Sequence, residues 1–405
     1  MTPLRIILVM IEPPLPFGNA TARWYYVLLK ELVQRGHRVT AYAACSKPEE
    51  IAKARDLFPA PAYDLRLYPF PTRSGFVSKI ETLRRPYSYM FSPELKADLA
   101  CELATEFDLL HLEQLSCVWL ARKHADRGIV NVHYLALIDL AELAATTLLW
   151  RFHRWLLMRS ERKLIREFKH FLTNSPRLVP LMLHINPSAT IDTVPLGIDI
   201  DQYPFIPDSQ RTNEPILSVI GSMNWHPSRS AVVRLLRQLW PEIKRRVPDA
   251  RVQIVGWSAR SSLAKFIDMP DVIIEENVPD TRSYFEQTGV MLYAPARGSG
   301  MKIKILEAFA YGVPVVTTSE GVEGIPAIDG VHASVAEDDA GLIERAVNLL
   351  QNPEQQNRQR AEGRQLLERH CGPKPTVDAI EAVYAKMMTK RGEERSGAGY
   401  HRSRR

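Results

Sequence analysis

The first 45 residues alternate between strand and helix patterns, and this alternation constrains the fold more than any other feature of the chain. Residues 4–10 form an apolar run of strand length, apart from Arg5. Residues 21–35 follow as a helix that Gly36 ends, and residues 37–44 form a second apolar strand. Two such strands joined by a helix require a parallel sheet that is covered by helices. The sequence therefore predicts an α/β fold.

The same alternation continues along the chain in two sets. The first set has further strands at residues 109–112, 129–133, 170–173 and 190–194. The second set begins at residue 216 and continues at residues 251–256, 272–275, 290–293 and 313–317. A Pro-rich stretch over residues 202–215 lies between the two sets. A chain of 405 residues is long enough for two domains with a core each.

Composition excludes several classes of protein. With 45% hydrophobic and 24% charged residues, the chain resembles an ordinary soluble globular protein. Residues 390–405 hold six Lys/Arg and two Asp/Glu, a net +4 of the total +6, so about +2 remains for the rest. This charge does not favour nucleic acid, and no nucleic-acid-binding motif is present. No apolar run reaches the ~18–20 residues of a membrane span, and no signal peptide is expected.

The four cysteines are widely spaced and form no CxxC pair, which indicates neither a zinc site nor a disulfide framework; they are Cys45, Cys101, Cys117 and Cys371. We therefore expect a cytoplasmic location.

The last residues of the chain, from 391 to 405, lack an apolar pattern and are expected to be a disordered basic tail.

Residues 297–318, RGSGMKIKILEAFAYGVPVVTT, predict a Gly-rich loop, a short helix, a turn and a buried strand. Gly298 and Gly300 allow the backbone amides to approach a ligand, and a helix that starts near residue 303 directs its positive end at the same place. Lys302 and Lys304 add positive charge, and Glu307 is an acceptor for sugar hydroxyls. Together these groups predict a site for a nucleoside diphosphate. Lys304 and Glu307 are also spaced i,i+3, so an ion pair on a helix surface is the simpler alternative.

The segment LEAFAYGVPVVTT resembles the donor-binding signature of retaining, group 1 (family 4) glycosyltransferases with the GT-B fold. The resemblance implies that Glu307 holds the ribose of a nucleotide sugar. It also implies that the loop from Gly298 through Ser299, Gly300 and Met301, with Lys302 or Lys304, holds the diphosphate. Many relatives carry a glutamate where this chain has Ser299, so the contact of that carboxylate with the donor sugar must come from another group.

The resemblance extends to the domain organisation. The sequence VPLGID, residues 194–199, is similar to the segment that leads from one domain to the other in this family. The resemblance implies two Rossmann-like, doubly wound domains, residues 1–199 and 200–375, which face a central cleft. A helix over residues 376–390 crosses back to the first domain. In the family's Gly-rich first loop, Gly18 and Asn19 match acceptor-side positions, although a turn required by chain geometry explains them equally well.

Polar residues follow the ends of other predicted strands. Gly221 and Ser222 end the first strand of the second domain, and the resemblance makes them part of the diphosphate pocket. The basic pair that many relatives carry there is absent, which shifts that role to Lys302 or Lys304. The loop residues Asn224 and Trp225 are explained equally well as the start of a helix.

Three further candidates lie in the first domain. His133 follows a buried strand, where the family places a histidine that reaches the donor sugar. His111 and Glu113 share one face of a strand end and are candidates for acceptor contact, although a solvated rim explains them better. No third ligand accompanies them, so no metal site is predicted.

Residues 146–170 contain seven Lys/Arg interleaved with aromatic and aliphatic residues. A basic amphipathic helix of this kind can lie on an anionic membrane at the inner face. Packing of Phe152, Trp155 and Leu156 into the core, with the arginines outside, explains the same pattern and is the preferred interpretation. The choice matters because many relatives act on lipid-linked acceptors.

These features predict a glycosyltransferase that moves a sugar from a nucleotide sugar to a glycan, lipid-linked or small-molecule hydroxyl, with retention and without a metal or other cofactor. His133 and Lys302 are the candidate catalytic residues. Two alternatives remain. One is another reaction on the same fold, such as that of a nucleotide-sugar epimerase or a phosphorylase, and the other is a member that binds a nucleotide sugar or a protein partner without turnover.

Overall fold

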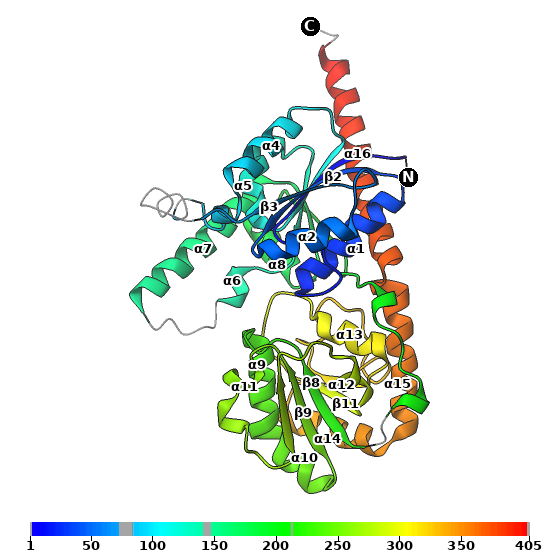
Figure 1. The fold of residues 1–405 in the computed structure, drawn as a ribbon. Coiled ribbons are helices and arrows are strands. Elements are labelled where there is room, and N and C mark those ends of the chain that lie inside the picture. Colours follow the sequence, from blue (N-terminus) through cyan, green and yellow to red (C-terminus); the bar gives the residue numbers. More distant parts are fainter. Residues whose placement is uncertain (1, 73–82, 84, 141–146, 212–213, 403–405) are drawn as a thin grey trace. The chain divides into compact units, whose positions relative to one another are not determined.

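A computed structural model describes residues 2–72, 83, 85–140, 147–211 and 214–402 of the chain (Figure 1). The chain divides into two compact units. Unit 1 comprises Met1–Gly197 and Pro373–Arg405, and unit 2 comprises Ile198–Gly372. This division falls close to the boundary predicted at Asp199, and the last helix groups with unit 1.

Unit 1 is built on a seven-stranded parallel sheet with the order β3-β2-β1-β4-β5-β6-β7. Its strands are β1 (Arg5–Met10), β2 (Arg38–Cys45), β3 (Asp64–Pro69), β4 (Leu109–Glu113), β5 (Gly128–Val132), β6 (His170–Thr173) and β7 (Thr190–Thr193). From β1 the chain adds β2 and β3 on one side and then places β4 to β7 on the other. The reversal lies between β1 and β4, and sheets of this kind bind ligands at the carboxyl ends of the strands beside it.

Helices connect these strands and pack against them. They are α1 (Ala20–Gln34), α2 (Pro48–Leu57), α4 (Pro93–Leu103), α5 (Val118–Ala121), α6 (Ala136–Asp139), α7 (Leu148–Glu167), α8 (Leu178–Ile185) and α16 (Pro373–Arg402). Strands β4 and β5 are buried along their whole length, including the polar residues His111 and Glu113 of β4 and Asn131 of β5. The second turn of α1 buries Trp24 and Tyr25.

Unit 2 has a six-stranded parallel sheet with the order β10-β9-β8-β11-β12-β13. Its strands are β8 (Ile216–Ile220), β9 (Arg251–Gly256), β10 (Val272–Glu276), β11 (Val290–Tyr293), β12 (Val315–Thr317) and β13 (Ser334–Val335). Its helices are α9 (His226–Arg234), α10 (Trp240–Arg246), α11 (Ala259–Ser262), α12 (Arg282–Glu286), α13 (Ile303–Tyr311), α14 (Asp339–Gln351) and α15 (Pro353–Leu366). Here the strand order reverses between β8 and β11.

The predicted strands agree with the structure to within one or two residues, and the α/β class with two parallel sheets is confirmed. Strand β3 was not predicted, although Leu65 and Leu67 alternate with polar residues in its sequence. The edge strand β13 has only two residues, too few to produce a periodic pattern.

The C-terminal segment differs from its prediction. Helix α16 continues to Arg402, whereas the sequence predicted a helix over residues 376–390 and a disordered tail from residue 391. Residues 403–405 lie outside the described part of the chain. Arg, Glu and Ala, which favour helix, make up six of the twelve residues 391–402, and a helix already formed can extend through them.

The Pro-rich segment after the boundary packs against unit 2. The guanidinium of the buried Arg360 donates to the carbonyl oxygen of Gly312 at 2.7 Å and also bonds Ile206 and Asp208. Its plane lies over the ring of Phe205, 5.0 Å from the centroid. The segment is therefore fixed to unit 2 along part of its length.

Candidate functional site

In unit 2, the predicted donor residues gather where the strand order reverses. Gly221 follows the carboxyl end of β8, and Tyr293 ends the neighbouring strand β11. Helix α13 begins beyond β11 and carries Lys304 in its first turn. The structure thus brings residues from three separate predicted segments to the edge of the sheet where doubly wound folds bind ligands.

The Lys304 ammonium lies over the backbone of Gly221. A Cβ atom at Gly221 would stand 2.9 Å from Lys304 Nζ, so the glycine leaves the space that the ammonium occupies. Gly221 also has φ +144°, a backbone conformation that residues with a side chain rarely adopt. The ammonium bonds the hydroxyl of Ser228, at the start of α9, and lies 4.5 Å from the centroid of the Tyr293 ring.

Lys304 is a cation without a counter-ion. Among the described residues no carboxylate forms an ion pair with it, and burial lowers the pKa of its ammonium from 10.5 to about 8, while Glu307 opposes that shift. A desolvated cation held by a hydroxyl and an aromatic face gains from an anion at the same place. The arrangement therefore favours binding of a phosphate group.

The Gly-rich loop before α13 has its own internal bonds. The amide of Gly298 donates to the Glu320 carboxylate at 3.2 Å, and the Lys302 ammonium bonds the carbonyl oxygen of Gly300. Ser299, Met301 and Lys302 are buried. Lys302 and Lys304 therefore bond different groups.

No side chain caps the N-terminus of α13, and its first turn contains no acidic residue. The amide of Ile305 donates to the carbonyl oxygen of Lys302 at 2.9 Å, and the positive end of the helix and the ammonium of Lys304 lie in the same turn, which suits an anion. Glu307, one turn further along α13, is partly buried and close enough to influence the charge of Lys304. This placement is compatible both with a ribose contact and with the helix-surface pairing that the spacing suggested.

The loop after β8 passes close to the end of β9. The amide of Gly221 donates to Val255 at 2.8 Å, and a Cβ atom at Gly256 would stand only 1.9 Å from the carbonyl oxygen of Gly221. Ser222 and Asn224 are exposed. Helix α9 starts next with a proline in its first turn and without a side-chain cap, so Asn224 and Trp225 contribute no capping hydrogen bond from their side chains.

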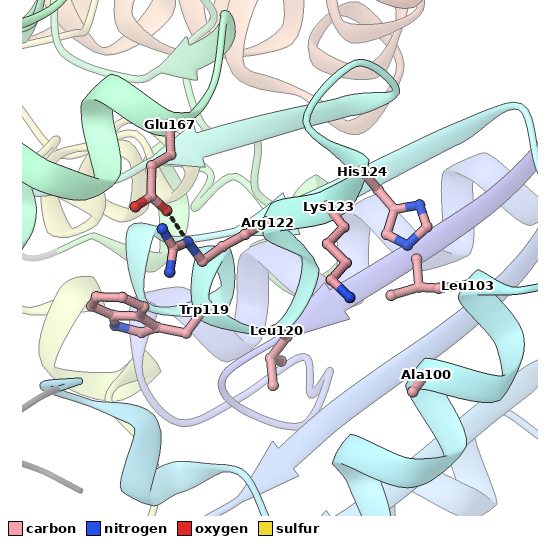
Figure 2. Close-up of a pocket in the computed structure, with 8 residues that line it drawn as sticks. All are labelled: Ala100, Leu103, Trp119, Leu120, Arg122, Lys123, His124 and Glu167. Atoms are coloured by element: carbon pink, nitrogen blue, oxygen red, sulfur yellow. Dashed lines mark ion pairs between the residues drawn. The ribbon is translucent and has the colours of Figure 1, made fainter.

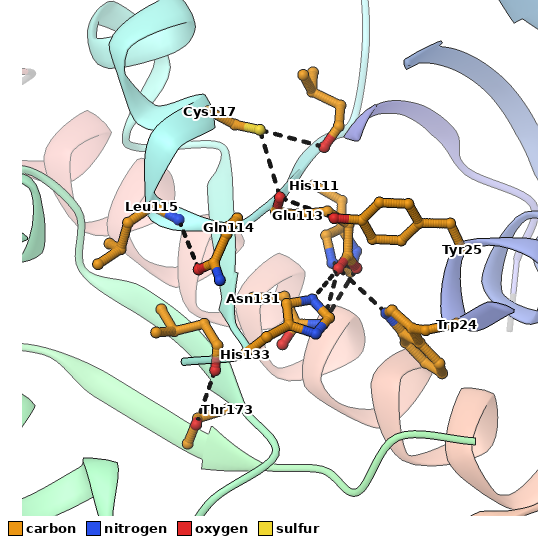
Figure 3. Close-up of polar contacts among 12 residues, drawn as sticks. Trp24, Tyr25, His111, Glu113, Gln114, Leu115, Cys117, Asn131, His133 and Thr173 are labelled. Carbon is orange, nitrogen blue, oxygen red and sulfur yellow. Dashed lines mark hydrogen bonds and ion pairs between the residues drawn. The ribbon is translucent and has the colours of Figure 1, made fainter. Parts of the chain in front are cut away.

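In unit 1, a buried polar network surrounds Glu113 at the carboxyl end of β4 (Figure 3). One oxygen of its carboxylate lies 2.9 Å from His111 Nε2 and the other lies 2.5 Å from His133 Nε2. Trp24 Nε1 donates to the carboxylate at 3.2 Å, and Asn131 Nδ2 donates to both oxygens at 3.2 and 3.3 Å. The carboxylate is therefore surrounded by four nitrogen groups.

This network keeps Glu113 ionised although it is fully buried. Burial alone would raise the pKa of the carboxyl group, but His133 and His111 outweigh it and lower that pKa to about 2. The ring nitrogen Nδ1 of His111 bonds the hydroxyl of Tyr384 on α16. Burial raises the pKa of Tyr384 well above 10, so this hydroxyl keeps its proton.

The structure corrects one interpretation of this region. His111 and Glu113 were interpreted as a solvated rim, but both side chains have no exposed surface. The rim interpretation was wrong because α1 and α16 cover the end of β4 with Trp24 and Tyr384, which lie far away in the sequence.

Gly18 and Asn19 lie apart from that network. Gly18 is exposed, with open space where a Cβ would be. The Asn19 side chain accepts a hydrogen bond from the amide of Ala22 at 2.8 Å and caps α1. This cap accounts for Asn19 without a ligand.

A cavity of about 690 Å³ lies elsewhere in unit 1 (Figure 2). It is lined by Ala100, Leu103, Trp119, Leu120, Arg122, Lys123, His124 and Glu167. Its cation Arg122 forms an ion pair with Glu167 at 2.5 Å. The cavity includes none of the predicted site residues, and His124 places it before β5, at the opposite end of that strand from His133.

Within the described ranges, no three His, Cys, Asp or Glu side chains are arranged to hold a metal ion. No helix in the same ranges is long and apolar enough to span a bilayer. Candidate function thus depends on the two polar clusters around Lys304 and Glu113.

Comparison with known proteins identifies both units. Residues 21–202 match the protein family described as Glycosyltransferase Family 4, and residues 214–352 match the family described as Glycosyl transferases group 1. A GDP-mannose-dependent alpha-(1-6)-phosphatidylinositol monomannoside mannosyltransferase from Mycolicibacterium smegmatis is 27% identical over 191 residues. That alignment covers 41% of this chain and 49% of the relative, so the chain spans about half the length of the curated relative that it matches.

Solved structures match nearly the whole chain. A sucrose-phosphate synthase from Thermosynechococcus elongatus has a TM-score of 0.68 at 14% identity and covers 97% of this chain and 100% of its own. TarM from S. aureus has a TM-score of 0.70 at 10% identity, and the match covers 95% of this chain and 99% of TarM. Anabaena HepE in complex with UDP-glucose has a TM-score of 0.65 at 11% identity, and the match covers 94% of this chain and 99% of HepE. At such identities the likeness establishes the fold. Since both units match glycosyltransferase families and the fold is shared with GT-B enzymes, this chain belongs to the group 1 and family 4 glycosyltransferases.

Proposed function

We propose that the chain transfers a sugar from a nucleoside diphosphate sugar to a hydroxyl group, with the diphosphate bound by unit 2. The observation that carries this proposal is the position of Lys304. Its desolvated ammonium has no carboxylate partner among the described residues and lies over Gly221, where the strand order reverses between β8 and β11. The relatives support the choice of ligand, since the M. smegmatis enzyme is named as GDP-mannose-dependent and HepE was solved with UDP-glucose.

In this proposal the protein supplies the positive charge that the leaving diphosphate requires. The bond between the anomeric carbon and the diphosphate oxygen breaks while the acceptor oxygen bonds to that carbon, and the hydroxyl proton passes to the phosphate. Lys304 and the positive end of α13 stabilise the charge that develops on the diphosphate. We therefore propose that the reaction requires no metal ion and no other cofactor.

The remaining donor contacts follow the resemblance. We assign Glu307 to the ribose, the loop from Gly298 to Lys302 to the diphosphate, and His133 of unit 1 to the sugar. Retention of configuration is also part of the proposal and would be read from the anomeric configuration of the product. An epimerase would yield no acceptor product, and a member without turnover would bind a nucleotide sugar and leave it intact.

The first test is a titration of UDP, GDP and their sugars, followed by Glu307→Ala. We expect the wild-type chain to bind one of the two nucleotides. The variant should bind it at least ~10-fold more weakly, because hydrogen bonds between a charged group and ribose hydroxyls contribute about 1.5–3 kcal/mol in total. Calorimetry measures both affinities. Equal affinities would assign Glu307 to the helix-surface pair with Lys304 instead.

The acceptor part of the proposal depends on α7. Phe152 and Trp155 were expected to pack in the core, but 50% and 53% of their surfaces are exposed, and the two rings stack on each other. Leu148 and Leu149, at the start of α7, are 81% and 78% exposed. The preferred interpretation was therefore wrong for the first half of the helix, although Leu156 is buried as expected.

The outward face of α7 changes character along its length. Helical spacing places Leu148, Phe152, Trp155, Arg159 and Arg162 on one face, so an aromatic half is followed by a cationic half. The N-terminal end of α7 lies away from the sheet of unit 1 (Figure 1). Exposed aromatic rings beside exposed arginines complement a membrane with anionic headgroups, so we propose that this face contacts such a membrane and that the acceptor is lipid-linked.

We expect the chain to sediment with anionic liposomes at low salt and to be released as salt rises. Replacing the exposed Arg151, Arg159 and Arg162 with glutamine should weaken partitioning by roughly 100-fold, since each cation contributes about 1 kcal/mol near such a surface. Arg154 is excluded because it donates to the carbonyl oxygen of Leu140.

The matched control replaces three exposed cations elsewhere in unit 1, Arg38, Lys53 and Arg55, with glutamine. The two variants carry the same net charge, so only the position of the charges differs. Equal partitioning of both variants would show that α7 is not the contact, and the acceptor would then be sought among soluble molecules.

A further inference from the structure

Two histidine–carboxylate pairs of unit 1, His37–Glu381 and His133–Glu113, differ in one respect. In the first, His37 Nε2 lies 2.8 Å from Glu381, and His37 Nδ1 accepts a hydrogen bond from the amide of Leu4 at 3.1 Å. Both ring nitrogens of His37 are therefore used within the protein. This pair joins α16 to the start of β1 and β2, and its function is structural.

In the second pair, one ring nitrogen remains unused. His133 Nε2 lies 2.5 Å from the Glu113 carboxylate, whereas His133 Nδ1 forms no hydrogen bond with any residue that the structure describes. The ring has 6% of its surface exposed and meets the edge of Tyr25 at a centroid distance of 6.1 Å. His133 Nδ1 is thus an atom of this network that remains for a ligand.

The chemistry of Glu113 determines where the proton of His133 resides. An ionised carboxylate only accepts hydrogen bonds, so every nitrogen around it must donate. Trp24 and Asn131 donate through fixed N–H groups, and His133, whose Nε2 bonds the carboxylate, must therefore carry a proton on Nε2. The neighbouring His111 is fixed from its other side as well, because Tyr384 retains its hydroxyl proton and can donate it to His111 Nδ1.

We propose that Glu113 is a positioning residue, which fixes His133 in the Nε2–H tautomer and so leaves the Nδ1 lone pair to accept a hydrogen bond from a hydroxyl group of the sugar. This inference rests on the proposed sugar transfer. It adds a role for Glu113, and through His111 for Tyr384, in place of the acceptor contact that the sequence suggested. Because Glu113 has no exposed surface, it acts on the substrate through His133 alone.

The test variant is Glu113→Gln, which keeps the size of the side chain. An amide has one acceptor oxygen and one NH₂ group, so it cannot accept from both histidines. In those molecules of the variant whose amide NH₂ group faces His133, the ring must accept a hydrogen bond on Nε2 and therefore carries its proton on Nδ1. Nitrogen-15 NMR of the imidazole rings reports the tautomer directly. We expect Nε2–H for His133 in the wild-type chain and a mixture of tautomers in the variant.

Turnover gives the second readout. Release of nucleotide from the sugar donor in the absence of an acceptor requires no knowledge of the acceptor. We expect Glu113→Gln to lower kcat by on the order of 10- to 100-fold, the effect of losing a hydrogen bond to the reacting sugar. Nucleotide affinity should stay within about twofold, since the residues proposed to bind the diphosphate belong to unit 2.

Glu381→Gln is the matched control, because it alters the His37–Glu381 pair of the same unit. It should lower stability and leave both the His133 tautomer and kcat unchanged. Glu113→Asp, which keeps the negative charge, should retain the Nε2–H tautomer.

An Nδ1–H tautomer of His133 in the wild-type chain, or a ring protonated on both nitrogens, would overturn the proposal, even if Glu113→Gln failed to fold. An equal loss of kcat in Glu113→Gln and Glu381→Gln would overturn it as well. Absence of nucleotide binding by the wild-type chain would instead contradict the proposed sugar transfer and leave the tautomer measurement as the test of Glu113.

Discussion

Lys304→Met is expected to abolish most nucleotide binding and, at the same time, to raise the thermal stability of the chain. Binding should weaken by roughly 100-fold, because the variant loses a charge-assisted hydrogen bond to phosphate of about 1.5–3 kcal/mol. The opposite signs of the two effects separate this variant from one that damages the fold.

The gain in stability follows from the pKa of Lys304. Burial lowers that pKa to about 8 in the folded chain, from 10.5, so below pH 8 folding must keep a cation in an unfavourable place. This cost is fully present at pH 7 and disappears as the pH rises from 8 to 10.5. Removing the charge should gain roughly 1 kcal/mol at pH 7 after allowance for partial exposure. Scanning calorimetry should show this as about 2–4 °C in Tm.

Lys302→Met is the matched control for this prediction. Lys302 is two residues away, carries the same charge and bonds the carbonyl oxygen of Gly300 within its own loop. We expect a smaller loss of nucleotide affinity and no gain in Tm. Equal, small losses of affinity from both variants would assign the diphosphate to the backbone amides alone.

Gly256→Ala is expected to destabilise unit 2 strongly and to abolish nucleotide binding. A Cβ at this position would stand 1.9 Å from the carbonyl oxygen of Gly221, and φ is +154°. The neighbouring atom belongs to the backbone, so β8 and β9 must separate where the donor loop begins. Strain and overpacking together should cost about 3–5 kcal/mol, which is roughly 10 °C in the Tm that scanning calorimetry measures.

Gly330→Ala separates the two contributions to that cost. Gly330 has φ +75° but no atom within 4 Å of a Cβ, so the substitution tests backbone strain without overpacking. We expect a cost of about 1 kcal/mol and unchanged nucleotide affinity. Similar Tm values for the two variants would show that the approach of β9 to Gly221 is looser than the structure indicates.

Most strands and the fold class could be predicted because the pattern that encodes them is local. A strand buried on both faces produces a short apolar run, as in β1 and β11, and each run can be recognised without knowledge of its neighbours. Short edge strands such as β13 do not produce such a run.

The partners of the site residues could not be predicted, because crossover connections bring together residues that are far apart in sequence. Lys304 is 76 residues from Ser228, Glu113 is 89 residues from Trp24, and His111 is 273 residues from Tyr384. The sequence placed Lys304 and Glu113 at element ends, but their burial and charge depend on these distant neighbours.

Helix α7 shows a second limit. Its periodicity shows that Phe152 and Trp155 share a face, and in the structure that face is exposed. A pattern of apolar residues identifies a face that avoids water, and the neighbouring elements decide whether protein covers it.

Calorimetric titration of the wild-type chain with UDP and GDP at pH 7 and pH 9 tests the central claim, that the unpaired Lys304 binds the diphosphate. At pH 9 the free ammonium is mostly deprotonated, because its pKa is about 8, and binding must restore the proton. We predict an affinity about tenfold lower at pH 9 than at pH 7, together with proton uptake at pH 9 that Lys304→Met abolishes. Equal affinities at both pH values without proton uptake would contradict the claim.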